Sequence, residues 1–338
     1  MREPMAVTIK DVAKAAGVSV ASVSRALNGH ENVTDATRAR IVDIASRLRY
    51  RPNDAARSLI TRRTRTIGAI LPALQGDFFS ELIRGIDLAA RTRGLHLLVS
   101  SSHADADETA AALRSMQGRV DGLLVMSPHV DPGLLDANLP DALPAVIMNA
   151  RIGHSRHPTL AIDDHGGALA MTRHLFSVGH RRIAFIAGPT GNFAADERLR
   201  GYRDAFAAAG IEREAIVLAG DFSEQSGRTA GHAMADDPQR PDAVFAANDL
   251  MAIGCLLALA GRGFTIPTEI AIAGFDDVPA ARYVTPALTT VRARIAELGR
   301  NAVACLAAEM EALGSSSSTP QVLPCELVVR ASCGRSSR

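Results

Sequence analysis

Residues 8–28, TIKDVAKAAGVSVASVSRALN, predict two short helices joined by a tight turn. Thr8 is a good N-cap, and Asp11, three residues later, forms a capping box with a shorter acid than the usual glutamate. Gly17 supplies the turn that ends the first helix, and Ser19 caps the second. The stretch is typical of a helix-turn-helix whose second helix enters a DNA groove.

The side-chain pattern of this stretch separates an inner face from an outer one. The residues predicted to face inward are Val12, Ala13, Ala16, Val23, Ala26 and Leu27. Those left on the outer face of the second helix are Val20, Ala21, Ser22 and Arg25. Any small helical hairpin shows similar periodicity. The rest of the chain therefore has to decide between a DNA-binding helix-turn-helix and an ordinary helical hairpin.

A third helix and a basic connector follow. Thr34, in VTDATRARIVDIASRL, is predicted to cap the third helix, whose apolar side chains pack under the first two; these are Ile41, Ile44, Ala45 and Leu48. Residues 49–65 are a basic connector that contains NDAARSLI. Eight residues are marginal as an isolated helix, so we expect this segment to be disordered without DNA and helical with it.

Composition bounds the rest of the chain. A length of 338 residues suits a small head plus two lobes, and a hydrophobic content of 47% permits sizeable cores. Residues 1–65 hold 13 Lys and Arg against 6 Asp and Glu, a balance of +7, although the whole chain carries only +1. A basic head on an acidic body is typical of a protein whose head alone meets phosphates.

Targeting and metal signals are weak. The segment MREPMAVTIK has no apolar region of a secretory signal, and no apolar run reaches transmembrane length, so we expect a cytoplasmic protein. The four cysteines show no close CxxC pairing, so neither a disulfide framework nor a zinc site is indicated. His154 and His157 have no acidic or thiol partner nearby, and no metal or other cofactor is expected.

From residue 66 onward, short apolar strands alternate with amphipathic helices, which indicates parallel sheets covered on both faces. The pattern restarts after Asp163 with a similar number of units. We therefore predict an all-α helix-turn-helix head plus an α/β core of two similar lobes, each a doubly wound parallel sheet.

The chain resembles the lactose/galactose repressor family of bacterial transcription regulators over almost its whole length. The motifs that carry the resemblance, in order, are VTIKDVAKAAGVSVASVSRALNG, VTDATRARI, YRPNDAARSL, DFFSELIRGID, VDGLLVM, GHRRIAFIAGP, FAANDLMAIG, AIAGFDD and TPALTTVR. The resemblance implies a periplasmic-binding-protein-like core with crossovers near 161–165, 289–293 and 320–324. The domains implied are a head at 1–50, a hinge at 51–65, an N-terminal lobe at 66–162 plus 291–321, a C-terminal lobe at 163–290 plus 322–330, and a tail at 331–338.

The resemblance also implies the DNA contacts. Val20, Ala21 and Arg25 occupy the positions that family members use to read bases, and an arginine can contact guanine O6 and N7 together. Phosphate contacts are implied for Ser19, Ser22, Ser24, Asn28 and Thr34, with simple capping as the alternative for the hydroxyl residues. The matched hinge motif adds Asn53, Arg57 and Leu59. Leu59 aligns with the leucine that relatives wedge into the minor groove, although it could be an ordinary linker residue.

A second site is expected in a cleft between the lobes, at the carboxyl ends of their strands. The implied effector-binding residues are Phe78, Phe79, Arg198, Phe222, Asn248 and Asp276, a set that suits a polyol with one apolar ring face. Phe78 and Phe79 could be partly core. Asp249 is interpreted as a helix N-cap and Asp277 as loop polarity. Residues 191–197 lack the basic residue that purine-responsive relatives carry, which disfavours a purine.

The function predicted is that of a ligand-responsive repressor, a homodimer on a palindromic operator, with an effector that is a sugar or sugar derivative; a purine-like effector is the alternative. A solute-binding protein would share the two-lobe body but needs a signal peptide and no head. A sugar-modifying enzyme is disfavoured, because GxSxG, GxxxxGK and GxGxxG motifs are absent where such chemistry needs them.

Overall fold

The computed structural model describes residues 7–27, 32–50, 63–130, 135, 137–139, 142–150, 155–211, 215–312 and 320–334. The chain divides into two compact units, residues 1–64 and 65–338, called the head and the core below and described separately. Four predicted DNA contacts lie outside the described residues: Asn28, Asn53, Arg57 and Leu59.

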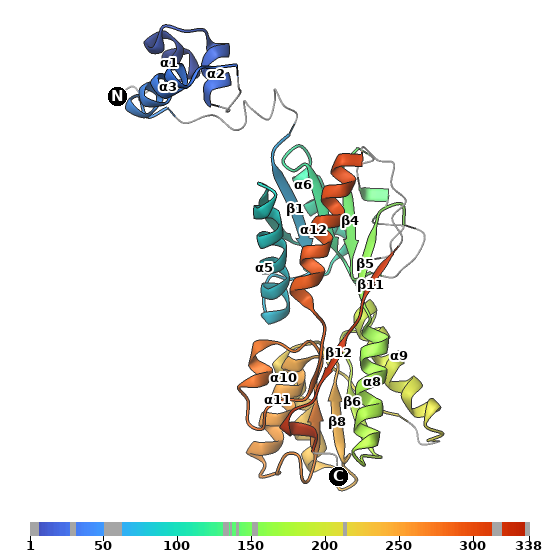
Figure 1. Ribbon diagram of the computed structural model, residues 1–338. Helices are drawn as coiled ribbons and strands as arrows, with labels where there is room; N and C mark the ends of the chain where they lie inside the picture. The colour runs from blue at the N-terminus through green and yellow to red at the C-terminus, as the bar shows by residue number, and fades with distance from the viewer. Residues whose placement is uncertain are drawn as a thin grey trace. The chain divides into compact units, whose positions relative to one another are not determined.

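The described part of the head contains three helices (Figure 1), which are α1 (Ile9–Ala16), α2 (Val20–Leu27) and α3 (Asp35–Arg47). The Asp11 carboxylate accepts a hydrogen bond from the Thr8 backbone N–H at 2.9 Å, and Gly17 ends α1 with φ of 62°. A positive φ suits glycine because it has no Cβ to clash. The predicted helix-turn-helix is therefore confirmed at both ends of its first helix.

One apolar cluster holds the three helices of the head together. Val12, Val23 and Ile41, one from each helix, have no exposed surface. Leu27 and Leu48 are partly buried against the same cluster. The inward stripes predicted from the spacing of apolar residues are confirmed.

The first sheet of the core has six parallel strands, in the spatial order β11–β5–β4–β3–β1–β2. Its strands are β1 (Thr66–Leu71), β2 (His96–Ser101), β3 (Gly122–Met126), β4 (Ala145–Met148), β5 (Thr159–Ile162) and β11 (Gln321–Leu323). The helices that accompany it are α5 (Asp77–Thr92), α6 (Ala106–Met116) and α12 (Ile295–Ala312). The alternation of side chains along a strand divides them between two faces, because neighbouring residues point to opposite sides. Ile67 and Leu71 of β1 join the cluster that contains α5 and α12, whereas Ile70 joins Leu113 of α6.

The second sheet has four parallel strands, in the order β7–β6–β8–β9. Its strands are β6 (Ile183–Ile186), β7 (Ile216–Leu218), β8 (Ala243–Ala246) and β9 (Ala271–Ala273). The helices are α8 (Asp164–Ser177), α9 (Phe193–Ala208), α10 (Glu224–Asp236) and α11 (Asp249–Gly261). Figure 1 shows α8 and α9 on one side of β6 and β8, and α10 and α11 on the other. The sheet is parallel, its strands are apolar, and helices cover both of its faces, as the sequence predicts.

The chain crosses between the two sheets more than once. After β5 it enters α8, and after β10 (Thr290–Arg292) it returns to the first lobe through α12. β11 then pairs with β5, and β12 (Glu326–Val328) pairs antiparallel with β10. The lobe boundaries proposed above stay predictions. The sequence does not predict β5 or α12. It predicts a helix that begins at residue 197, but α9 begins four residues earlier, because Asn192 caps it.

Residues 331–338 are predicted to be a tail, but the first three of them are part of the core. Ala331–Cys333 form a short 3₁₀ turn in which Ser332 and Cys333 have no exposed surface. The Ser332 hydroxyl donates to the Ile272 carbonyl at 2.6 Å and accepts from the Thr289 backbone N–H at 2.8 Å. These bonds tie the turn between β9 and β10, a long-range pairing that local sequence does not reveal.

A close helix contact in the first lobe provides a stability test. A Cβ added at Gly85 of α5 would lie 2.3 Å from the Ala296 carbonyl oxygen of α12, whereas one added at Gly261 of α11 meets nothing within 4 Å. We expect Gly85→Ala to lower the unfolding free energy by about 1–3 kcal/mol, because the two helices must separate. Gly261→Ala should be neutral or stabilise by up to about 1 kcal/mol through helix propensity. Calorimetric melting of both variants checks this; a Gly85→Ala melting temperature at or above that of Gly261→Ala contradicts the contact.

Candidate functional site

A cavity of about 630 Å³ lies in the core where strands of both sheets end. Its walls come from the segments that directly follow β1, β3 and β4 in the first sheet and β6, β7, β8 and β9 in the second. The carboxyl ends of parallel strands are where α/β sheets bind ligands. All six residues predicted for the effector site line this cavity: Phe78, Phe79, Arg198, Phe222, Asn248 and Asp276.

A buried ion cluster forms one wall. Arg198 of α9 is 3% exposed; its Nε donates to Asp164 Oδ1 at 2.8 Å and its Nη1 to the Ala247 carbonyl at 2.6 Å. Nη1 also lies 3.1 Å from Asp276 Oδ1. Burial alone would lower the pKa of Arg198, but Asp276 and Asp164 outweigh it and raise that pKa, so the guanidinium stays charged.

Asp276 carries an acceptor that the protein leaves unused. It is 6% exposed, and burial raises its pKa to about 6, with Arg198 opposing the rise and Asp164 adding to it. Its Oδ1 makes no hydrogen bond with good geometry despite the short approach of Arg198. A carboxylate oxygen can accept more than one hydrogen bond, so a ligand hydroxyl or N–H with better geometry than Arg198 would lower the free-energy cost of burying it.

Aromatic rings form the apolar part of the wall. The Phe78 and Phe79 rings meet edge to face, with centroids 5.2 Å apart. Phe222 lies close to Gly188, where an added Cβ would sit 2.6 Å from the ring. The Arg198 guanidinium lies 5.9 Å from the Phe222 centroid. The cavity thus offers charged groups beside flat apolar faces.

Four lining residues other than glycine have positive φ values that side chains rarely adopt: Ala104 (57°), Asn149 (50°), Phe222 (70°) and Asp276 (112°). Such conformations cost free energy and persist only where the surroundings enforce them. Their concentration around one cavity is typical of a ligand site.

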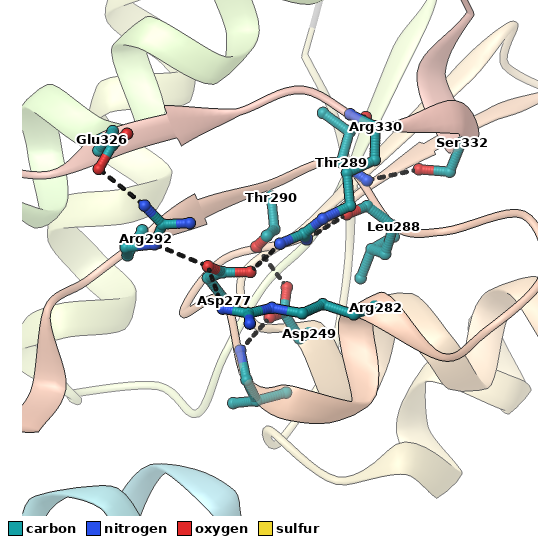
Figure 2. Close-up of polar contacts among 11 residues, drawn as sticks. Asp249, Asp277, Arg282, Leu288, Thr289, Thr290, Arg292, Glu326, Arg330 and Ser332 are labelled. Carbon is teal, nitrogen blue, oxygen red and sulfur yellow. Dashed lines mark hydrogen bonds and ion pairs between the residues drawn. The ribbon is translucent and has the colours of Figure 1, made fainter.

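The turn that carries Asp276 is fastened by two buried carboxylates (Figure 2). Asp249 accepts from the Thr290 hydroxyl at 2.5 Å and from the Val278 backbone N–H at 2.9 Å, and burial raises its pKa well above the usual value. The interpretation of Asp249 as the N-cap of α11 is wrong. Asn248 caps that helix by accepting from the Met251 N–H, while its amide donates to the Phe222 carbonyl.

Asp277 is the second of these carboxylates, with a side chain only 1% exposed. It accepts from Arg292 Nε at 2.8 Å and from Arg330 Nη2 at 2.5 Å, and Arg282 lies 3.5 Å away. Burial would raise its pKa, but the bonds from Arg330 and Arg292 hold it below its usual value. The interpretation of Asp277 as loop polarity is therefore wrong, because Asp277 joins the turn to Arg292 of β10 and to Arg330 in the segment that follows β12.

Sequence reasoning missed several polar residues of the cavity. His129 follows β3, Asn149 follows β4, and Asn192 caps α9. The Asn192 amide lies 3.3 Å from His129 Nε2, and the Phe193 N–H donates to the Pro128 carbonyl at 3.1 Å, so the two lobes touch here. Burial lowers the pKa of His129. The rule that identified the other candidates, a polar residue just after a buried strand, also fits His129 and Asn149.

On the head, the predicted base-reading residues lie on an outer face. Val20, Ala21 and Arg25 are exposed, and the Arg25 Nε donates to the Ala21 carbonyl at 3.2 Å. Ser19 accepts from the Ser22 N–H at 3.1 Å, so it caps α2 as predicted. Ser22 and Ser24 are partly exposed, and Thr34 caps α3 by accepting from the Thr37 N–H.

The described residues contain neither a candidate metal cluster nor a candidate membrane span. No cluster of three or more histidine, cysteine or acidic side chains able to hold a metal ion occurs among them. Within the same part of the chain, no helix is long and apolar enough to cross a membrane.

Comparison with known proteins decides the family. Residues 8–53 match the family model described as bacterial regulatory proteins, lacI family, and residues 172–333 match a periplasmic binding protein-like domain. The chain is 37% identical to the HTH-type transcriptional repressor PurR of Edwardsiella ictaluri over 96% of both chains. The chain belongs to the lacI family of bacterial regulatory proteins.

Solved structures of relatives agree with the observed fold. A lac repressor dimer bound to operator and the anti-inducer ONPF is 27% identical and superposes with a TM-score of 0.90, covering 98% of this chain and 100% of that one. A complex of the regulator CelR with cellobiose is 32% identical with a TM-score of 0.71, covering 96% and 99%. This lacI-family chain is thus a DNA-binding transcriptional repressor regulated by an effector, with a helical head and a two-lobe α/β core.

The raised pKa of Asp276 gives this repressor a pH-dependent stability without effector. Between about pH 4 and 6 the folded protein binds a proton at Asp276 that the unfolded chain does not bind. The contribution of this proton to the free energy of unfolding is therefore full below the unfolded pKa and is lost as the pH rises through about 6. The melting temperature of the wild type relative to Asp276→Asn should therefore fall from pH 4.5 to 7.5. Asp277→Asn is the control: its lowered pKa puts titration below this range, so its difference from wild type stays flat. A flat difference for Asp276→Asn as well would contradict the assignment.

Proposed function

We propose that this repressor binds a palindromic operator as a homodimer, one head on each half-site, and that an effector in the core cavity modulates this binding. The proposal is supported by the lac repressor, solved as a dimer bound to operator, with which the chain superposes over nearly its full length. Two-fold symmetry in the protein requires matching symmetry in the DNA.

In this proposal α2 is the recognition helix. Arg25 makes a bidentate contact with a guanine, and Val20 and Ala21 pack against base edges such as a thymine methyl. Ser19, Ser22, Ser24, Asn28 and Thr34 contact phosphates, and the hinge residues Asn53, Arg57 and Leu59 act at the operator centre. The exposed positions of Val20, Ala21 and Arg25 on one helix support this assignment.

Replacement of Arg25 tests the DNA contact. Arg25→Ala should weaken operator binding by about 1–3 kcal/mol per half-site and relax the preference at one base pair. Arg62→Ala, in the basic connector, should weaken all sequences about equally. Titrations on operator variants at each position of a half-site, at fixed salt, measure both effects. Uniform loss on cognate and scrambled sites for both variants would remove Arg25 from the base-reading set.

For the core, the proposed effector is a small sugar or sugar derivative. One observation carries this assignment: the unused buried acceptor of Asp276 lies beside Arg198 and near the Phe222 ring, a combination that suits a polyol with one apolar face. The relative CelR, solved with cellobiose, adds support. The effector shifts the populations of two core states, because it binds one of them more tightly.

The resemblance to PurR favours a purine as the second candidate. One observation disfavours a purine effector. Residue 192, the N-cap of α9, is an asparagine whose amide oxygen accepts from the Ala195 backbone N–H and whose amide nitrogen lies 3.3 Å from His129 Nε2. A thermal-shift screen with sugars and with purine bases separates the two.

Removal of the Asp276 carboxylate tests the site. Asp276→Ala should weaken the effector found by that screen by about 1–3 kcal/mol or more, because ligand donors lose their acceptor in a desolvated cavity. Its operator affinity should no longer respond to the effector. Calorimetric titration measures the effector affinity of the variant, and a melting curve measures its stability. Undiminished effector affinity in a folded Asp276→Ala protein would place the effector elsewhere, and joint loss of stability and operator binding would make Asp276 only a structural residue.

A further inference from the structure

The cavity has more negative than positive groups on its described walls. Asp77, Asp221, Glu224 and Asp276 line it, against a single guanidinium, Arg198, and no lysine among the lining residues that the structure describes. His129 adds no charge near neutral pH, because burial lowers its pKa.

The charge of Arg198 is already matched within the protein. Asp164 and Asp276 lie 2.8 Å and 3.1 Å from its nitrogens, and all three side chains are at least nine-tenths buried. Two carboxylates face this one cation, so Arg198 has no unmatched positive charge even though burial raises the pKa of both acids. Among the lining residues that the structure describes, an anionic ligand would therefore meet no cation that lacks a counter-charge.

Helix N-termini could still attract an anion, because they carry partial positive charge. Four helices, α5, α9, α10 and α11, begin at this cavity. Each carries an acid in its first turn, and three have side-chain caps; the acids are Asp77, Asp196, Glu224 and Asp249, and the caps are Asn192, Ser223 and Asn248. Only α5 lacks a side-chain cap, since its N-cap is Gly76, and its backbone N–H groups suit a neutral oxygen beside the Asp77 carboxylate.

We infer that the effector is an uncharged molecule rich in hydroxyl or N–H donors, and that the phosphate esters and carboxylic acids of the same skeleton are rejected. The inference rests on the proposed function, in which this cavity holds the effector. A neutral donor satisfies the unused Oδ1 of Asp276 and adds no charge. A phosphate or carboxylate brings acceptors and negative charge to a wall that already has both in excess.

Matched pairs of small molecules test the inference on the full-length repressor. The pairs are D-glucose with glucose 6-phosphate and glucuronate, D-galactose with galacturonate, D-ribose with ribose 5-phosphate, and adenosine with its 5′-monophosphate. Melting-temperature shifts at constant ionic strength, followed by calorimetric titration, give the affinity of each member. In every pair with a binder, the neutral member should bind at least tenfold more tightly than its anion.

A charge-neutral variant tests the cause. Glu224 is exposed at the edge of the cavity, and Glu224→Gln should raise the affinity of the anionic member relative to the neutral one by about threefold. Glu197→Gln is the matched control: Glu197 pairs with Arg200 of its own helix, as Glu224 pairs with Arg228, but Glu197 does not line the cavity, so this variant should leave the ratio unchanged.

The outcomes separate this inference from the proposed function. An anion that binds more tightly than its neutral parent overturns the inference and leaves the cavity as the effector site. Binding by adenosine alone keeps the inference and replaces the sugar with a purine nucleoside. A panel in which no member binds or alters operator affinity overturns the sugar effector and the inference with it.

Discussion

Arg198 is held in the interior by carboxylates from two distant segments, Asp164 at the start of α8 and Asp276 after β9. A guanidinium this deep can stay only if it is paired. The cluster therefore fixes three parts of the fold at once: the entry from β5 into the second lobe, the helix α9, and the turn that carries Asp276. The position of the cavity follows from that arrangement.

The turn itself depends on a second layer of polar contacts (Figure 2). Asp249 accepts from the Val278 backbone N–H, and Asp277 accepts from Arg292 of β10 and from Arg330, which follows β12. Arg292 also pairs with Glu326 across β10 and β12 at 2.9 Å. In this turn Asp276 has a φ of 112°, and its Oδ1 contacts Arg198 without a hydrogen bond of good geometry. The same contacts link the cavity wall to the segments that run between the lobes, so a ligand that moves this turn acts directly on those segments.

The head is held together by one small apolar cluster and by local caps and turns. Three short helices enclose one small apolar cluster, and their turns and caps are local: a glycine at φ of 62°, a capping box, and hydroxyl caps on α2 and α3. The outer face of α2 takes no part in that cluster, so Arg25 and its neighbours are available to DNA.

The sequence determined what depends on neighbours along the chain. Helix periodicity, Gly17 and Ser19 predicted the helix-turn-helix, and apolar strands alternating with helices predicted the parallel sheets. The motifs of the core identified six residues that all line one cavity. Asp249 and Asp277 were misread, because the partners that bury them, Thr290, Arg292 and Arg330, are distant in sequence. Asp164 has no local signal either, since its carboxylate is defined by Arg198, 34 residues later. The charge of the cavity was decided only in three dimensions, because a carboxylate acts through what surrounds it and the chain brings those groups together only when it folds.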